Sequence, residues 1–168
     1  NLCPKPTIAL VHGACVGGGT GIAAACDIVI ASEDAFFSIA EVRWGLHAGP
    51  ILPQLAAAMG TRNLRRYAIT GERFDARMAQ ALGLVHEVCA TGELEATAAP
   101  VIDSILKNGP DAIADTKKII FDTSNLAIDD DLALELARDH ARKRRTDEAA
   151  EGLRSFEEKR DAQWYSGS

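Results

Sequence analysis

Three consecutive glycines, Gly17 to Gly19, are the first residues of this chain whose type and position suggest chemistry. They follow an apolar pair, Cys15 and Val16, and precede small residues at helical spacing (residues 20–26). Glycine adopts positive φ and lets another group approach the backbone closely. The unpaired N–H groups at a helix N-terminus attract negative charge. The pattern therefore predicts a backbone pocket for an anion: a phosphate, a carboxylate or a developing oxyanion. No Gly-Lys-Ser/Thr sequence follows, which excludes a P-loop.

Glu41 is the second candidate, because it ends an apolar segment that includes Phe36 and Phe37. A carboxylate at the border of an apolar region can accept a proton and return it. Structural alternatives stand beside both candidates. Glu41 is otherwise a solvated strand-end carboxylate or the ion-pair partner of Arg43, and the glycines otherwise serve only close packing of a helix on a strand.

A strand, turn, helix and strand must position these residues. Residues 8–11 form an apolar run, Gly13 marks a turn, residues 20–26 have helical spacing, and residues 28–30 are β-branched. Residues 34–39 read as a short strand that leads to Glu41, and residues 84–88 as another strand. Between them, residues 42–53 contain two glycines and two prolines, so a loop or a broken helix is expected there.

The C-terminal part is a series of amphipathic helices. Apolar residues recur at helical spacing in residues 93–108, 111–124, 129–143 and 146–160. The sequence therefore predicts an α/β part over residues 1–90 and an α-helical part over residues 91–168.

Composition narrows the class of protein. The 168 residues are enough for one domain with a sizeable core, and the net charge of −6 argues against nucleic acid as a partner. Asp27 and Glu33 interrupt the longest apolar run, so no membrane span is expected. The four cysteines have no zinc-ligand spacing and read as small buried hydrophobes. We expect a cytoplasmic protein without a secretory leader or a bound metal.

An ordered set of motifs covers nearly the whole chain. It consists of GGG, ACD, AF-S-AE, TGERFDA, A-LGLV and EG-SF-EKR, within residues 5–46, 67–88 and 151–164. This set resembles the enoyl-CoA hydratase/isomerase (crotonase) superfamily. The resemblance implies a crotonase-like α/β core of repeated ββα turns, followed by helices that pack on a neighbour in a trimer. It also implies that this sequence is the C-terminal part of such a chain, and that an earlier half supplies one oxyanion donor.

The resemblance gives roles to the two candidates. The N–H of Gly18, next to Gly17, would be one of two donors to the thioester carbonyl oxygen of an acyl-CoA. Glu41 falls on the position of a catalytic glutamate. CoA is then part of the substrate, and no separate cofactor is implied.

The sequence departs from the family at Gly21. The best-known hydratases have a second glutamate three residues after the oxyanion-hole glycine, and here that position is Gly21. Either Glu41 handles both proton transfers of one water, or Gly21 widens the pocket for a branch or a carboxylate of the substrate.

The motifs GGGTG, SIAEVRWGL and TGERFDA resemble those of hydratases that act on branched glutaconyl-CoA thioesters. These enzymes are of the isohexenylglutaconyl-CoA or methylglutaconyl-CoA type and belong to terpenoid or leucine catabolism. Such substrates carry a second carboxylate, for which Arg43 or His47 is a candidate. The alternatives are a surface ion pair for Arg43 and a plain loop role for His47.

Three further positions come from the resemblance. Gly49 falls near a glycine that lines the pocket, and Phe156 and Lys159 match a segment that covers a neighbour's acyl pocket and contacts CoA phosphates. For Lys159 the alternative is a solvated charge. The sequence thus predicts an enoyl-CoA hydratase that forms trimers or dimers of trimers (hexamers). An isomerase or other acyl-CoA enzyme with one glutamate, and a non-catalytic scaffold, are the alternatives.

Overall fold

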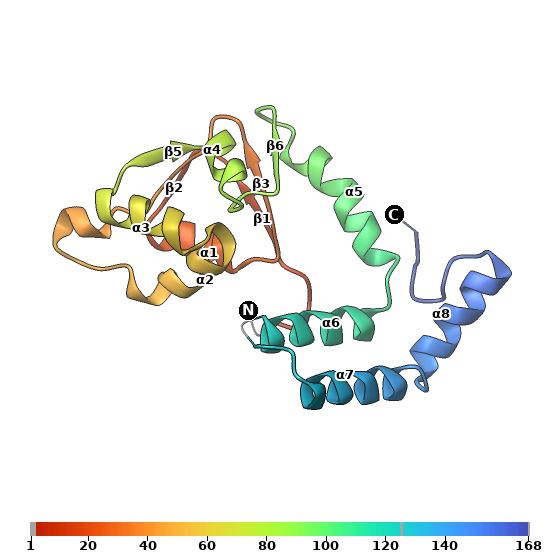
Figure 1. Ribbon diagram of the computed structural model, residues 1–168. Helices are drawn as coiled ribbons and strands as arrows, with labels where there is room; N and C mark the ends of the chain where they lie inside the picture. Colours follow the sequence, from red (N-terminus) through yellow and green to blue (C-terminus); the bar gives the residue numbers. More distant parts are fainter. Residues whose placement is uncertain (1–2, 125, 168) are drawn as a thin grey trace. The chain divides into compact units, whose positions relative to one another are not determined.

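Residues 3–124 and 126–167 are described by a computed structural model, in which the chain forms two compact units (Figure 1). The first unit comprises residues 6–100, and the second comprises residues 3–5 and 101–167. The units divide the chain inside helix α5 (Leu94–Leu106), whereas the sequence suggested a division after residue 90. In the described ranges, no helix has the length and hydropathy needed to cross a membrane.

Two small sheets form the first unit. The parallel sheet has the order β1-β3-β6 and comprises β1 (Ile8–Val11), β3 (Ile28–Ser32) and β6 (Glu87–Cys89). The second sheet has the order β2-β4-β5 and comprises β2 (Ala14–Val16), β4 (Phe36–Ser38) and β5 (Arg73–Asp75). The chain passes from the first sheet to the second after β1 and again after β3, and α1 (Gly18–Ala25) joins these two turns. This is the repeated ββα connection expected from the sequence.

Short helices follow the second turn of the chain. They are the 3-10 segments η1 (Glu41–Trp44) and η2 (Gly49–Ile51), then α2 (Leu52–Met59), α3 (Thr61–Thr70) and α4 (Ala76–Ala81). The two 3-10 segments confirm the broken helix expected in residues 42–53. Asp75 caps α4 as its position suggests, because its Oδ1 accepts a hydrogen bond of 2.7 Å from the N–H of Met78.

The strand predicted at residues 84–88 begins later than expected. The N–H groups of Leu84 and Val85 both donate to Ala79 O, at 2.9 and 3.2 Å, and so close the end of α4. Both side chains are buried, at 1% and 2% exposure, which explains their apolar type without a strand. Strand pairing starts only at Glu87, opposite Ile30.

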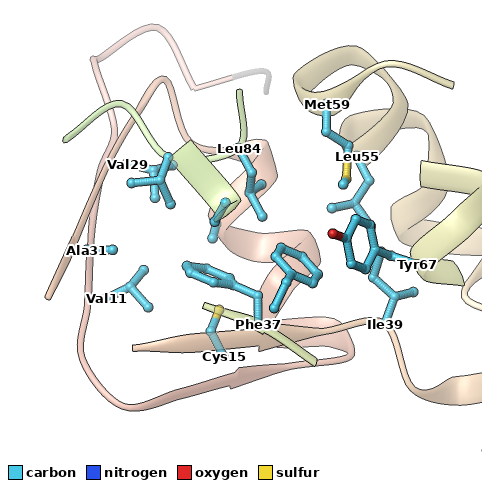
Figure 2. Packing of buried hydrophobic residues seen from close by; sticks show 14 of the residues in the cluster. Val11, Cys15, Val29, Ala31, Phe37, Ile39, Leu55, Met59, Tyr67 and Leu84 are labelled. Atoms are coloured by element: carbon cyan, nitrogen blue, oxygen red, sulfur yellow. The ribbon is translucent and has the colours of Figure 1, made fainter. Parts of the chain in front are cut away.

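The core of the first unit lies around Phe37 on β4, which is fully buried (Figure 2). Its ring stacks on Phe74 of β5 with a centroid distance of 5.7 Å, and Tyr67 of α3 lies 4.4 Å from Phe74. Figure 2 shows Leu55 and Ile39 beside this aromatic group. Burial of large rings contributes most of the stabilisation in a core of this size. The strand that leads to Glu41 is therefore among the best-packed segments of the unit.

The second unit is helical, with α6 (Pro110–Thr123), α7 (Asp130–Lys143) and α8 (Asp147–Glu158) after the end of α5. Glu148 caps α6: its carboxylate oxygens accept from the N–H groups of Asp111 and Ala112, at 2.7 and 2.8 Å. Lys143 Nζ lies 3.3 Å from Glu148 Oε1, which ties α7 to the same carboxylate. Large apolar side chains on this unit remain exposed, among them Ile120, Phe121 and Ile128.

Candidate active site

Gly17 and Gly18 mark the junction between β2 and α1. Gly17 is the N-cap of α1 and has φ 58° and ψ −123°, a conformation that only glycine adopts readily. Its N–H donates to Ser38 O of β4 at 2.8 Å. The backbone therefore turns sharply between the sheet and the helix, as the glycine run predicted, and this turn sets the direction in which the first N–H groups of α1 point.

Thr20 fixes the first turn of α1 to the second sheet. Its hydroxyl is fully buried and lies 2.7 Å from Cys15 O and 3.1 Å from Ser38 O, so that its proton is shared between two strand carbonyls. Sequence reasoning did not assign Thr20 a role. The available signal was a hydroxyl inside an otherwise apolar helix, since a buried hydroxyl needs a partner.

Glu41 lies against the glycine turn. It is the first residue of η1, and its Oε1 is 3.0 Å from the point where a Cβ on Gly17 would stand. Its Oε2 is buried and has no hydrogen-bond partner among the residues that the structure describes. An unpaired buried carboxylate oxygen is costly, and a proton or a ligand relieves that cost. The structure thus brings together Gly17 and Glu41, which lie far apart in the sequence.

Gly18 begins α1 beside this carboxylate. Residues in the first helical turn have N–H groups without an intrahelical acceptor. A Cβ placed on Gly18 would meet no heavy atom of the described residues within 4 Å, so the space next to its backbone is open. The pair therefore offers a hydrogen-bond donor and a proton acceptor at one place.

One alternative from the sequence was that Gly21 widens the pocket, but in the structure the space next to Gly21 is filled. The side chain of Ile51 from η2 occupies the space next to Gly21, with its Cγ2 and Cβ at the point where a side chain would begin and its Cδ1 3.3 Å away. Gly21 itself is buried. Its missing side chain makes room for Ile51 and not for a substrate branch or carboxylate.

Arg43, His47 and Gly49 lie on the exposed segment that follows Glu41. The Arg43 Nε is 3.1 Å from the point where a Cβ on Gly71 would stand, so the guanidinium lies along the turn after α3. The His47 Nδ1 accepts a hydrogen bond of 3.2 Å from the N–H of Gly49. A Cβ on Gly49 would stand 2.8 Å from that nitrogen, so a side chain there would displace the exposed imidazole. A substrate contact by these three residues remains a prediction.

Two large apolar side chains on this segment are exposed. Trp44 is 79% exposed and Leu46 64%, on either side of Gly45, which has φ 70°. Ile22 on α1 is 71% exposed. Contiguous apolar surface marks a binding site, whereas single exposed apolar side chains are common on folded proteins. Sequence reasoning passed over Trp44, although a tryptophan in a glycine-rich loop was the available signal.

The thiol of Cys15 lies close to the glycine turn, with its Sγ 3.8 Å from the point where a Cβ on Gly19 would stand. Burial raises the pKa of this thiol above its ordinary value, and a hydrogen bond with Thr20 offsets part of the increase. Cys15 is therefore a neutral packed side chain near pH 7 and no nucleophile.

Phe156 and Lys159 belong to the second unit. Phe156 on α8 is 82% exposed. Lys159 follows α8 in the left-handed region, with φ 51°, a position that usually holds glycine. Their predicted contacts with an acyl pocket and with CoA phosphates remain predictions.

Comparisons with known proteins place this site in a family context. The family model described as enoyl-CoA hydratase/isomerase matches residues 1–167. A putative enoyl-CoA hydratase of Thermus thermophilus is 35% identical over 157 residues, which are 94% of this chain and 62% of the relative. The mevalonyl-coenzyme A hydratase sidH of Aspergillus fumigatus is 35% identical over 162 residues, 95% of this chain and 60% of the relative.

Isomerases and solved structures match as well. A peroxisomal Delta(3,5)-Delta(2,4)-dienoyl-CoA isomerase of Arabidopsis thaliana is 37% identical over 132 residues, 77% of this chain and 48% of the relative. The crystal structure of an enoyl-CoA hydratase from Shewanella pealeana is 41% identical with a TM-score of 0.93, covering 97% of this chain and 61% of that one. The chain thus spans 48–62% of the length of these three curated relatives.

Proposed function

Because this chain belongs to the enoyl-CoA hydratase/isomerase family, we propose that it adds water to the double bond of a 2-enoyl-CoA thioester. The observation that carries the proposal is the carboxylate of Glu41. It lies against Gly17, next to the N-terminus of α1, and its buried Oε2 has no hydrogen-bond partner within residues 3–124 and 126–167. A carboxylate held beside a backbone N–H can move a proton while that N–H binds a developing oxyanion.

The reaction needs only one carboxylate if one water molecule supplies both the hydrogen and the hydroxyl group that are added to the double bond. Glu41 takes a proton from water as the water oxygen bonds to the β-carbon. The electron pair of the double bond moves toward the thioester oxygen, which the N–H of Gly18 holds. Glu41 then returns the proton to the α-carbon, so that H and OH are added and the carboxylate is restored. A fixed oxyanion donor of this kind lowers the barrier by roughly 3–4 kcal/mol.

A specific observation favours a second candidate, which is double-bond isomerisation. The space at Gly21 is filled by Ile51 and not by a polar group. Position 21 therefore supplies no second carboxylate beside Glu41. An isomerase takes a proton from one carbon and returns it to another, for which one carboxylate suffices. The dienoyl-CoA isomerase of Arabidopsis thaliana is a relative of this kind by name.

The substrate we propose is branched and carries a second carboxylate, as in isohexenylglutaconyl-CoA or methylglutaconyl-CoA. The exposed cation of Arg43 and the imidazole of His47 support this part, because both lie on the segment that follows Glu41. The relative from Aspergillus fumigatus is, by name, a hydratase of mevalonyl-CoA. We further propose contacts of Lys159 with CoA phosphates and of Phe156 with a neighbouring subunit's acyl pocket, in a homotrimer or a dimer of trimers.

The test is the substitution Glu41→Gln in the full-length protein, assayed by the loss of the conjugated thioester absorbance. Loss of the proton carrier should lower kcat by about 10²–10⁴-fold. Glu33→Gln is the matched control, because Glu33 is an exposed glutamate of the same unit and should keep wild-type kcat. A Glu41→Gln variant with wild-type kcat would contradict the proposal. It would mean that another group moves the proton, whereas a wild-type protein without any turnover would favour the non-catalytic scaffold.

Oxygen-18 water separates the two candidate reactions. Hydration places one oxygen from water in the product, whereas isomerisation places none. The hydratase proposal predicts one labelled oxygen per turnover in the product, measured by mass spectrometry. An unlabelled isomer as the sole product would make the protein an isomerase that uses the same Glu41.

A further inference from the structure

Gly21 and Ile51 fit together as one unit. Gly21 lies in the second turn of α1, where a glycine weakens the helix unless the missing side chain has a purpose. Both Cγ2 and Cβ of Ile51 stand where a side chain on Gly21 would begin. Glycine at position 21 is therefore required by Ile51, and the hollow that it leaves determines where Ile51 lies.

This hollow faces the site. Gly21 is three residues beyond Gly18, so the two share one face of α1, with Cβ positions about 5–6 Å apart. Side chains on a helix lean toward its N-terminus, and a group at the Gly21 position therefore leans toward Gly18. The methyl groups of Ile51 occupy that position. Ile51 is only half-buried, which leaves part of its surface available for contact.

We propose that Ile51, seated in the hollow over Gly21, is a specificity-determining residue that forms an apolar wall for the hydrocarbon part of the acyl group. This inference rests on the proposed binding of an acyl-CoA thioester at Gly18. The side chain of Ile51 has no hydrogen-bonding group, so a substrate carboxylate is unfavourable against it. The acyl carbons next to the thioester lie against Ile51, and any second carboxylate of the substrate is bound elsewhere.

The packing half of the proposal is tested by thermal unfolding. Gly21→Ala should lower Tm by about 3–10 °C, since overpacking a filled site strains it. The substitution Ile51→Ala would retain the Cβ that overlaps the Cβ position of residue 21. Ile51→Gly is therefore the variant that empties the hollow. In that background Gly21→Ala should no longer lower Tm. Gly19→Ala is the matched control, because its nearest neighbour, Cys15 Sγ, is at an ordinary 3.8 Å.

The specificity half is tested by calorimetric titration with two saturated probes, butyryl-CoA and its 3-methyl analogue isovaleryl-CoA. Ile51→Gly should raise the affinity ratio of isovaleryl-CoA over butyryl-CoA by roughly tenfold, because space opens for the extra methyl group. Ile51→Val and Ile51→Thr form an isosteric pair. The threonine variant should bind butyryl-CoA about tenfold more weakly than the valine variant, because its hydroxyl loses water against hydrocarbon.

Each result has a defined meaning. Unchanged affinity ratios in all variants, with both probes bound, would reduce Ile51 to a packing residue and overturn the inference. So would a Gly21→Ala variant with wild-type Tm. Shifted ratios together with no hydration of any enoyl-CoA would support the wall and refute the proposed reaction. A wild-type protein that binds neither probe would overturn both.

Discussion

Gly18→Val separates the function of the glycine turn from its role in folding. Gly18 is helical, so its backbone suits any L-residue, and no heavy atom of the described residues lies within 4 Å of an added Cβ. Valine in a helix is slightly more favourable than glycine, by about 0.4 kcal/mol. The variant should therefore fold with a Tm close to that of the wild type.

The same substitution fills the open space next to the N–H of Gly18. If the thioester binds at the N–H of Gly18 as proposed, two added methyl groups crowd the acyl group there. Removal of one oxyanion-hole donor costs about 2.7–4 kcal/mol, or roughly 10²–10³ in kcat. Gly18→Ala adds a single carbon and should give a smaller loss. The effect on kcat/KM should thus follow the volume of the added side chain, while the free energy of unfolding stays nearly constant.

Gly17→Ala is the contrasting variant. Gly17 has φ 58°, and its added Cβ would stand 3.0 Å from Glu41 Oε1. Alanine in this conformation costs about 1–3 kcal/mol, so Tm should fall together with kcat. Both variants are measured by circular dichroism melts and by hydration of 2-enoyl-CoA. Wild-type kcat/KM in a folded Gly18→Val variant would refute the assignment of Gly18 as an oxyanion donor.

Three further predictions concern stability. Glu148→Ala removes the carboxylate that caps α6 and should cost about 1 kcal/mol in urea unfolding, whereas Glu157→Ala on the exposed surface of α8 should cost nothing measurable. The Arg160 guanidinium holds the pKa of Glu151 below its ordinary value, so the pair stabilises the fold at neutral pH and this contribution is lost as pH falls through the lowered folded-state pKa. Glu151→Gln should therefore lower stability at pH 7 and flatten its decline in acid; an unchanged pH profile would contradict the pairing. Thr20→Val keeps the shape but loses the buried hydroxyl, and should cost about 1–3 kcal/mol, with Thr20→Ser recovering part of it.

The glycine turn and Glu41 could be predicted because their signals are local. A run of glycines before small residues needs no knowledge of the rest of the chain, and Glu41 ends a recognisable apolar strand. Strand β5 was missed for the opposite reason. Its three residues, from Arg73 to Asp75, are extended because they pair with β4, which lies far earlier in the chain. Pairing over that distance leaves no periodicity in so short a segment.

The contact between Gly21 and Ile51 shows a second limit of sequence reasoning. A missing side chain in a sequence suggests free space, and a widened pocket was therefore one of the two alternatives for Gly21. Whether that space is empty depends on which element packs against the helix, and here η2 brings Ile51 into it. Close packing leaves few voids in a folded protein. A glycine in a helix thus often allows the side chain of another element to pack against the helix. Which side chain does so can be learned only from the fold.

One backbone atom holds the two parts of the candidate site in register. Ser38 O accepts from the N–H of Gly17 at 2.8 Å and from the hydroxyl of Thr20 at 3.1 Å, which ties the start of α1 to the last residue of β4. Glu41 follows this strand after only Ile39 and Ala40. The relative position of the Gly18 N–H and the Glu41 carboxylate is therefore set by the backbone of β4. The buried ring of Phe37 on the same strand keeps β4 in place. A carboxylate oxygen without a hydrogen-bond partner among the described residues can persist here because a well-packed strand stabilises the segment that carries it.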